Sequence, residues 1–335
     1  MRILAGDIGG TKTALAIAEL VHGRCRLARV ERYHSSDHAG LAEIVAAFLK
    51  DEGKRPAAAG FGVAGPVRAG RSKVTNLSWK LDEKSLERST RIRRVTLVND
   101  FGANALGLRF LGPRQVATLA RGRPDPRGPV ALLGAGTGLG QAGVVRSGSA
   151  SLAVVPSEGG HVDFGPRSPL EDRLVAYLRR QFGRTTRERI LSGSGLVLLY
   201  EFLADAGVAR SGPEATASLA GAEDRAAVIS QLALEKKDPL CAAALDLFVE
   251  IYGSEAGNLA LQYRATGGVY VAGGIAPKIL PALQAPAFLR AFREKPPMQE
   301  LLEGIPVRVV LDPRLGLYGA AAAAVAGATR ATATG

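Results

Sequence analysis

The chain has 335 residues, 47% hydrophobic and 22% charged, which is typical of a soluble globular protein long enough for two domains. Its net charge is +12, but the basic residues are scattered and aromatic residues make up only 5%, which argues against nucleic-acid binding and favours attraction of anionic substrates. Two cysteines, no apolar run of the ~20 residues that span a membrane and no secretory signal predict a cytoplasmic protein without disulfides or a cysteine zinc site.

The first predicted element is a pair of strands, residues 4–8 and 14–18, joined by a polar turn. The turn offers glycine N–H groups, hydroxyls and an ammonium, which are the groups that bind phosphate. They belong to Gly9, Gly10, Thr11, Lys12 and Thr13. Asp7 ends the first strand, where it could hold a cation through water. The spacing fits neither a Walker loop nor a dinucleotide fingerprint, and an ordinary glycine hairpin turn is the alternative.

A third strand over residues 26–33 and a helix over 41–49 follow. The helix has its apolar residues at helical spacing, and we expect Ser35, Ser36 or Asp37 to cap it. A buried strand over 58–64 comes next. Antiparallel strands followed by alternating strands and helices predict a mixed sheet with helices packed against it.

An acidic residue stands where the buried strand over residues 95–98 meets a helix over 101–108. Open α/β sheets bind ligands at the carboxyl ends of their strands, so Asn99 and Asp100 are candidate site residues. The same pair could instead cap the helix, and the two roles are compatible. Asn76 is a weaker candidate, in the segment that contains the single tryptophan.

A second glycine turn, residues 134–140, lies between strands over 130–133 and 141–145. It repeats the arrangement of strand, Gly/Thr turn and strand seen at the start of the chain. Gly136, Thr137 and Gly138 are its candidate phosphate ligands. Two such turns predict a duplicated architecture that grips a polyphosphate from two sides.

The rest of the chain is mostly helical, with acids in two loop-like segments. Glu158 and His161 lie in the first segment and Glu188 in the second. A metal site at His161 and Asp163 is rejected, because no third ligand follows at a suitable spacing. We expect helices to begin at Ser168-Pro169 and Asp238-Pro239. A buried strand over 268–272 ends in a third glycine turn, and a strand over 307–311 precedes a final helix over 315–326.

Taken together, the motifs resemble those of the bacterial ATP-dependent glucokinases over nearly the whole chain. They are D-I-G-G-T-K-T from Asp7, L-V-N-D-F from Leu97, G-A-G-T-G-L-G from Gly134, E-G-G-H-V-D-F from Glu158, E-R-I-L-S-G-S-G-L from Glu188 and V-A-G-G-I-A-P-K from Val271. Each motif is weak by itself, but their order and spacing are highly specific. The chain lacks the cysteine-rich zinc motif of the repressor-related branch, and its phosphate turn begins too early for an N-terminal helix-turn-helix.

The resemblance implies an actin-like ATPase (ribonuclease H-like) fold, an α/β architecture with two domains flanking a cleft. The first domain would comprise residues 1–111 and 312–330, and the second residues 112–311. It also implies a homodimer that acts in glycolysis.

The resemblance further implies transfer of the γ-phosphoryl group of ATP to the C6 hydroxyl of D-glucose, with Mg²⁺ held through water by Asp7. Asp100 would be the general base. The sugar would be bound by Asn76, Asn99, Asp100, Glu158, His161 and Glu188. The nucleotide would be bound by the two phosphate turns named above, with Gly273 and Gly274 against the adenosine.

Other functions stay open at this point. The nearest is a kinase for another hexose such as mannose, N-acetylglucosamine or fructose, because only the sugar contacts would differ. A filament-forming or sugar-sensing actin-like protein without catalysis is a different class, and the intact pair Asn99 and Asp100 argues against it.

Overall fold

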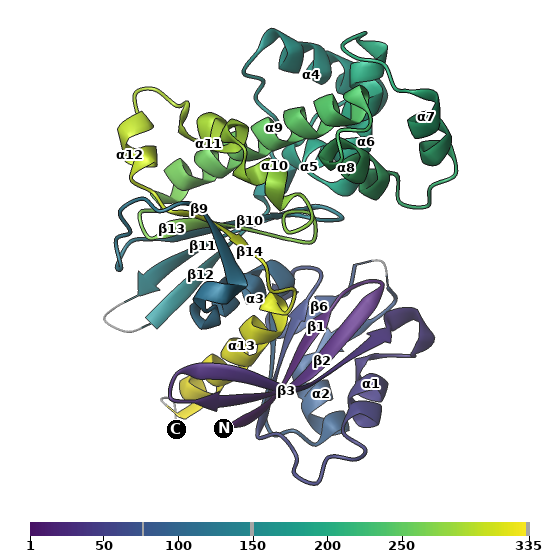
Figure 1. Ribbon diagram of the computed structural model, residues 1–335. Coiled ribbons are helices and arrows are strands. Elements are labelled where there is room, and N and C mark those ends of the chain that lie inside the picture. Colours follow the sequence, from purple (N-terminus) through teal and green to yellow (C-terminus); the bar gives the residue numbers. More distant parts are fainter. Residues whose placement is uncertain (76, 148–150, 333–335) are drawn as a thin grey trace. The chain divides into compact units, whose positions relative to one another are not determined.

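The computed structural model describes residues 1–75, 77–147 and 151–332 (Figure 1). Contacts divide the chain into two compact units. Unit 1 contains residues 1–115, the short stretch 152–156 and the chain from 312 onward, and unit 2 contains residues 116–151 and 157–311. The expected boundaries did not include the return of residues 152–156 to the first unit.

Unit 1 is built on a five-stranded mixed sheet. Its strand order is β3 (Arg24–His34), β2 (Lys12–Val21), β1 (Arg2–Ile8), β4 (Ala58–Val63) and β8 (Val95–Asn99). The first three strands form an antiparallel meander, and β4 and β8 run parallel to β1. The carboxyl ends of β1, β4 and β8 therefore lie at the same edge, which is where Asp7, Asn99 and Asp100 stand.

Helices cover both faces of this sheet. Successive side chains of a strand point to opposite faces, so alternate residues of β1 pack against different helices. Leu4 and Ile8 belong to a core with α1 (Leu41–Phe48) and α2 (Glu83–Thr90). Ile3 and Ala5 belong to a second core with α13 (Leu315–Thr332), which also packs along α3 (Asp100–Gly107). The C-terminal helix is thus part of the unit that begins the chain (Figure 1).

Glycines let α13 lie directly on its neighbours. A Cβ at Gly60 of β4 would be 1.9 Å from the carbonyl oxygen of Ala320. A Cβ at Gly319 would be 1.6 Å from the carbonyl oxygen of Ala103 in α3. Backbone therefore meets backbone on both sides of the helix, and no side chain fits between them.

The expected cap of α1 is wrong. Gly40 precedes the helix without a side-chain bond, and Ser35 to Asp37 form a separate turn of 3-10 helix. Ser35 is buried, its hydroxyl donates to the carbonyl oxygen of Gly9 at 3.0 Å, and it shares a 3.0 Å hydrogen bond with Thr13. Ser35, a residue type that often caps helices, instead holds the first glycine turn through its hydroxyl.

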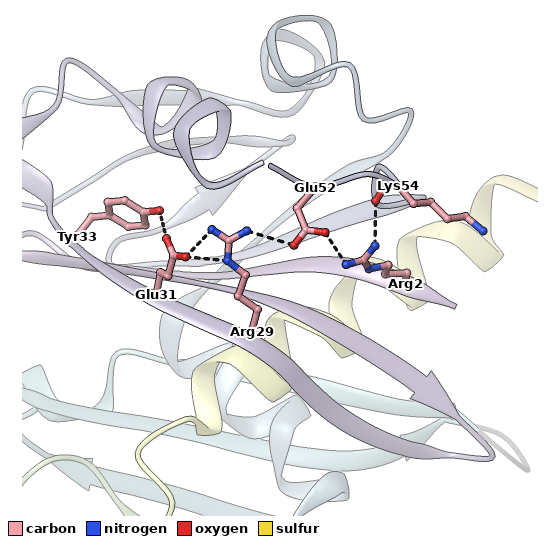
Figure 2. A network of polar contacts seen from close by, with 6 residues as sticks. All are labelled: Arg2, Arg29, Glu31, Tyr33, Glu52 and Lys54. Carbon is pink, nitrogen blue, oxygen red and sulfur yellow. Dashed lines mark hydrogen bonds and ion pairs between the residues drawn. The ribbon is translucent and has the colours of Figure 1, made fainter. Parts of the chain in front are cut away.

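A chain of polar contacts ties β3 to β1 across the segment after α1 (Figure 2). Arg29 donates to Glu31 at 2.7 Å and to Glu52 at 3.2 Å, and Glu52 also pairs with Arg2. The Arg29 guanidinium lies 4.5 Å from the ring centroid of Phe48, at the end of α1. Partly exposed ion pairs of this kind add modest stability. The contact of Arg29 with Phe48 means that the network also helps to hold the end of α1 against the sheet.

Unit 2 is built on a six-stranded sheet with the same plan as the first. Its order is β12 (Ser151–Ser157), β11 (Leu139–Ser147), β10 (Val130–Ala135), β13 (Gly268–Ala272), β14 (Val307–Val310) and β9 (Val116–Ala120). Residues 152–156 of β12 pair in this sheet although contacts assign them to unit 1. As in unit 1, a hairpin around a glycine turn, here β10 and β11, is followed by strands parallel to its first strand. The predicted duplication is confirmed.

The core of unit 2 is centred on α9 (Pro239–Tyr263), a helix buried over most of its length. Asp238 caps it by accepting from the Cys241 N–H at 2.7 Å, as its sequence predicts. The helices around it or further out are α4 (Pro169–Phe182), α5 (Arg187–Ile190), α6 (Gly193–Asp205), α7 (Pro213–Ala220), α8 (Arg225–Leu234), α10 (Leu280–Gln284), α11 (Pro286–Arg293) and α12 (Gln299–Glu303).

Short elements complete the two units. They are strands β5 (Val67–Arg68), β6 (Arg71–Lys73) and β7 (Lys80–Asp82), and 3-10 turns at 35–37, 108–110, 113–115 and 159–161. Among the described residues, no helix combines the length and the apolar character needed to cross a membrane.

Candidate active site

In the first glycine turn, some polar groups form hydrogen bonds within the protein and others are exposed at the surface. The Gly9 N–H donates to the carbonyl oxygen of Lys12 at 2.9 Å, and the buried Thr13 hydroxyl bonds to Ser35. These two predicted phosphate ligands are thus engaged in holding the turn itself. Thr11 and Lys12 are the exposed side chains of the turn, and Gly10 is partly exposed beside them.

Asp7 is the second-to-last residue of β1, next to this turn, in a crowded and partly buried place. A Cβ at Gly316, in the first turn of α13, would lie only 2.8 Å from Oδ2 of Asp7. Burial, and then the charge of Asp100, raises the pKa of Asp7 from 3.8 to about 6. A cation near this carboxylate would relieve the desolvation and the repulsion, so the residue fits the predicted role toward Mg²⁺.

Asn99 and Asp100 join β8 to α3 at the same sheet edge. Asn99 is the N-cap: its side-chain oxygen accepts from the N–H groups of Phe101 at 3.0 Å and Gly102 at 3.1 Å, and its amide donates to Gly65 at 3.2 Å. Asp100 begins the helix, and its Oδ1 accepts from the Phe101 N–H at 2.8 Å. The capping alternative is therefore realised by Asn99, which leaves Asp100 as an acid held at a helix N-terminus. Asn76 lies outside the described residues.

Three predicted sugar ligands come together in unit 2. His161 lies between two acids: its Nδ1 is 3.6 Å from Oε1 of Glu188, and its Nε2 is 4.0 Å from Oε2 of Glu158. Glu158 precedes a 3-10 turn and His161 is the last residue of that turn, whereas Glu188 comes from α5. Glu158 and His161 are exposed and Glu188 is one-third exposed, so the cluster offers several acceptors and a histidine to a hydroxyl-rich ligand.

Glu188 also belongs to the second glycine turn. Its Oε2 accepts from the Leu139 N–H at 2.9 Å, and a Cβ at Gly138 would lie 2.4 Å from the same oxygen. The turn is closed by the Gly136 N–H, which donates to Gly138 at 2.8 Å. One carboxylate thus connects the predicted sugar cluster to the predicted phosphate turn, a relationship that sequence spacing does not show.

A cavity of about 1100 Å³ opens beside this second turn. Gly136, Thr137 and Gly274, three of the predicted nucleotide ligands, line it, and their role toward a nucleotide stays a prediction. Gly273 has a φ of +84°, and a Cβ there would lie 2.3 Å from the carbonyl oxygen of Ala135, so the third turn requires glycine.

The cavity also shows lining residues that the sequence did not predict. Much of one wall comes from α8, including Ala227 and Ser230, and Lys278 follows the third turn. Arg189 lines the cavity next to Phe182, with its guanidinium 4.1 Å from the ring centroid. Arg189 and Lys278 lie inside recognised motifs but were not singled out, and the α8 residues belong to no motif, because a cavity wall is assembled from helices distant in the chain.

In the described part of the chain, no three His, Cys, Asp or Glu side chains lie close enough together to form a metal site from protein ligands alone. A magnesium ion carried by nucleotide phosphates needs only one or two protein carboxylates and keeps several waters. The setting of Asp7 satisfies this smaller requirement.

Comparison with known proteins gives a consistent result. A scan of protein families matches the glucokinase family over residues 4–327. A glucokinase from Nostoc punctiforme is 43% identical over 333 residues, covering 95% of this chain and 97% of the relative, and one from Photorhabdus laumondii is 36% identical over 94% of each.

The solved structures agree with the sequence relatives. A glucokinase from an Antarctic psychrotroph has a TM-score of 0.86 at 30% identity, covering 97% of this chain and 99% of that one. A ROK family glucokinase from Streptomyces griseus, solved with glucose and AMPPNP, has a TM-score of 0.65 at 22% identity over 97% and 100% of the two chains, a likeness of fold.

Proposed function

The chain belongs to the glucokinase family, and from this premise we propose the roles of its residues in transferring the γ-phosphoryl group of ATP to the C6 hydroxyl of D-glucose. The fold is that of the actin-like sugar kinases. The observation that carries the assignment of roles is the position of Asp100, an acid at the carboxyl end of β8 and the start of α3.

Asp100 is the proposed general base. Phosphoryl transfer needs a group that takes the proton of the attacking hydroxyl and holds that hydroxyl in line. The Phe101 N–H fixes Oδ1 of Asp100, and the Asn99 cap fixes the start of the helix, so the carboxylate has a defined orientation. Such pre-orientation is what a general base requires.

Glu158, His161 and Glu188 are the proposed sugar ligands of unit 2, and Asn76 and Asn99 are proposed ones of unit 1. Carboxylates accept hydrogen bonds from sugar hydroxyls, and each charge-assisted bond contributes about 1.5–3 kcal/mol when buried. Glu188 accepts from the Leu139 N–H with Oε2, and its other oxygen faces His161, beside which the sugar would bind. That orientation supports a role in reading the hydroxyl pattern.

ATP is the proposed occupant of the cavity beside Gly136, Thr137 and Gly274. The exposed Thr11 and Lys12 and the hydroxyl of Thr137 would bind phosphate oxygens, whereas Gly9 and Thr13 would maintain the first turn. Asp7 would hold Mg²⁺ through water, and the ion would neutralise charge on the phosphates.

The first test is ADP release from Mg-ATP by the purified protein with glucose, mannose, fructose or N-acetylglucosamine. Turnover with glucose well above the other sugars, abolished in Asp100→Asn, supports both the reaction and the base. Preferred turnover of another hexose would retain the mechanism and change the substrate. ATP binding without turnover of any sugar would contradict the proposal.

We also propose, from the likeness to the family, a cytoplasmic enzyme that acts as a homodimer in glycolysis. Light scattering coupled to gel filtration tests the dimer, with a mass near 70 kDa expected against a chain mass of 34.9 kDa. Fractionation of cells that express the protein tests its location.

A further inference from the structure

A buried carboxylate outside the proposed ligand set lies in the middle of α9. Glu255 is 4% exposed and accepts three hydrogen bonds: from Arg187 at 2.6 Å, from Gln141 at 2.7 Å and from Asn258 at 3.0 Å. Burial raises its pKa, and the charge of Arg187 opposes that shift. Buried ion pairs are weak stabilisers compared with apolar packing, so stability alone gives little reason for this arrangement.

Arg187 connects Glu255 to the sugar cluster. It begins α5, a helix of only four residues, and Glu188 is the next residue. A single turn is unstable without tertiary contacts. The Arg187 side chain reaches down to Glu255 and its N–H donates to Val162 at 3.1 Å, so both ends of this residue are fixed. The anchor therefore sets the place from which Glu188 reaches Leu139 and His161.

Gln141 connects Glu255 to the other sugar ligands. It lies on β11, is 1% exposed and donates to Glu255. Its Oε1 is buried without a hydrogen-bond partner among the described residues, and a Cβ at Gly159 would lie 2.0 Å from it. The backbone between Glu158 and His161 thus rests directly on the Gln141 amide, whose orientation Glu255 fixes.

We propose that Glu255 is a positioning residue for sugar binding, acting through Arg187 on Glu188 and through Gln141 on Glu158 and His161. The inference rests on the proposed function of this cluster and extends it to a carboxylate that does not touch the sugar. If this is so, the affinity for glucose depends on the buried contacts of Glu255 with Arg187 and Gln141 more strongly than the affinity for ATP does.

Glu255→Gln is the test, because it keeps the shape of the side chain and removes the charge that holds Arg187. Glu171→Gln is the matched control: Glu171 is 2% exposed and accepts from the N–H of Arg167 at 2.7 Å and from its guanidinium at 2.6 Å, so its ion pair is with a residue outside the sugar cluster. We expect Glu255→Gln to raise the glucose KM about tenfold and the ATP KM by a smaller factor, because Glu188 also contacts the second glycine turn. Glu171→Gln should leave the glucose KM within twofold of wild type.

Hydrogen exchange on the sugar-free proteins gives a readout independent of activity. Faster exchange confined to residues 158–162 and 187–191 is expected in Glu255→Gln and absent in Glu171→Gln. If Glu255→Gln does not fold, Glu255→Asp, which keeps the charge and shortens the reach, takes its place with the same expectation.

The outcomes separate the two ideas. Wild-type turnover of glucose tests the proposed function, and if another hexose is the substrate, its KM replaces that of glucose. An unchanged sugar KM and unchanged exchange in a folded Glu255 variant would overturn the inference alone. Equal rises in the sugar and ATP KM values, or the same changes in both Gln variants, would also overturn it, since they indicate general loosening of the unit.

Discussion

Asp7 and Asp100 stand at the carboxyl ends of β1 and β8 in the same sheet, and the charge of Asp100 adds to burial in raising the pKa of Asp7 to about 6. Two acids placed in this way are unfavourable for the empty protein. A pair that repels without a ligand and is stabilised by a cation and a hydroxyl is expected at a site for Mg-ATP and a sugar.

Asp7→Asn should stabilise the ligand-free protein at neutral pH. Because the folded pKa of Asp7 lies above the unfolded value of 3.8, the folded state binds more protons, and stability falls as the pH rises from about 4 to about 6. Removing the charge should add about 1–3 kcal/mol to the free energy of unfolding at pH 7.5 and much less at pH 4.5. Urea unfolding at the two pH values measures this, and an equal effect at both would contradict it.

Mg-ATP binding should release protons near pH 6. A cation beside Asp7 favours its charged form, so binding lowers the pKa of Asp7 and expels a proton from the fraction that carries one. Calorimetry at pH 6 in two buffers with different ionisation enthalpies counts these protons. The release should shrink in Asp7→Asn, and an unchanged count in that variant would assign the protons to another group.

Asp100→Asn should lower kcat by a factor of about 10²–10⁴, the usual contribution of a general base. The amide oxygen can still accept from the Phe101 N–H, so α3 should keep its start and glucose should still bind. Steady-state kinetics with calorimetric glucose titration separates these effects. Loss of glucose binding together with turnover would instead indicate a structural role.

Ala227→Trp should fill the cavity in unit 2 and weaken nucleotide binding. Ala227 lines the cavity from α8, so a large ring there would occupy the proposed place of ATP. We expect the ATP KM to rise at least tenfold while glucose affinity is kept. Ala217→Trp, on the exposed side of α7, is the matched control. If ATP binds equally well to both variants, the nucleotide lies elsewhere.

Gly319→Ala should strongly destabilise unit 1. The added Cβ would lie 1.6 Å from the carbonyl oxygen of Ala103, and rigid backbone on both sides has to move apart. Overpacking of this kind costs about 1–3 kcal/mol and occasionally more. Gly53→Ala, where nothing lies within 4 Å, is the control. Urea unfolding curves of the two variants should differ accordingly, and equal stabilities would contradict the close packing of α13.

Local signals predicted much of this architecture. The two glycine turns, the strands around them and the helix starts at Ser168 and Asp238 depend on residues close in the chain, and the structure has all of them. The grouping of Glu158, His161 and Glu188 was predicted from the family resemblance, and the structure brings the three together in one unit. Their roles in sugar binding stay a prediction.

Contacts between segments far apart in the chain could not be predicted from the sequence. Ser35 was predicted as a cap, but burial against Thr13 gives it a different task, and the choice depends on where the chain folds back. Glu255 and Gln141 are 114 residues apart, and neither has a local pattern that indicates a partner. Glu255 is one of three acidic residues in a mostly apolar helix, and nothing in that pattern indicates which cation or amide it meets.

The position of α13 has a consequence for synthesis of the protein. Unit 1 begins the chain, yet β4 and α3 are covered by a helix made from residues 315–332, which are synthesised after the whole of unit 2. Domains generally fold as units while the ribosome proceeds from the N-terminus. Unit 2 can therefore acquire its core first, whereas the apolar face of the N-terminal sheet waits until α13 has been synthesised. Nascent chains stalled before residue 315 should expose that face to chaperones and proteases.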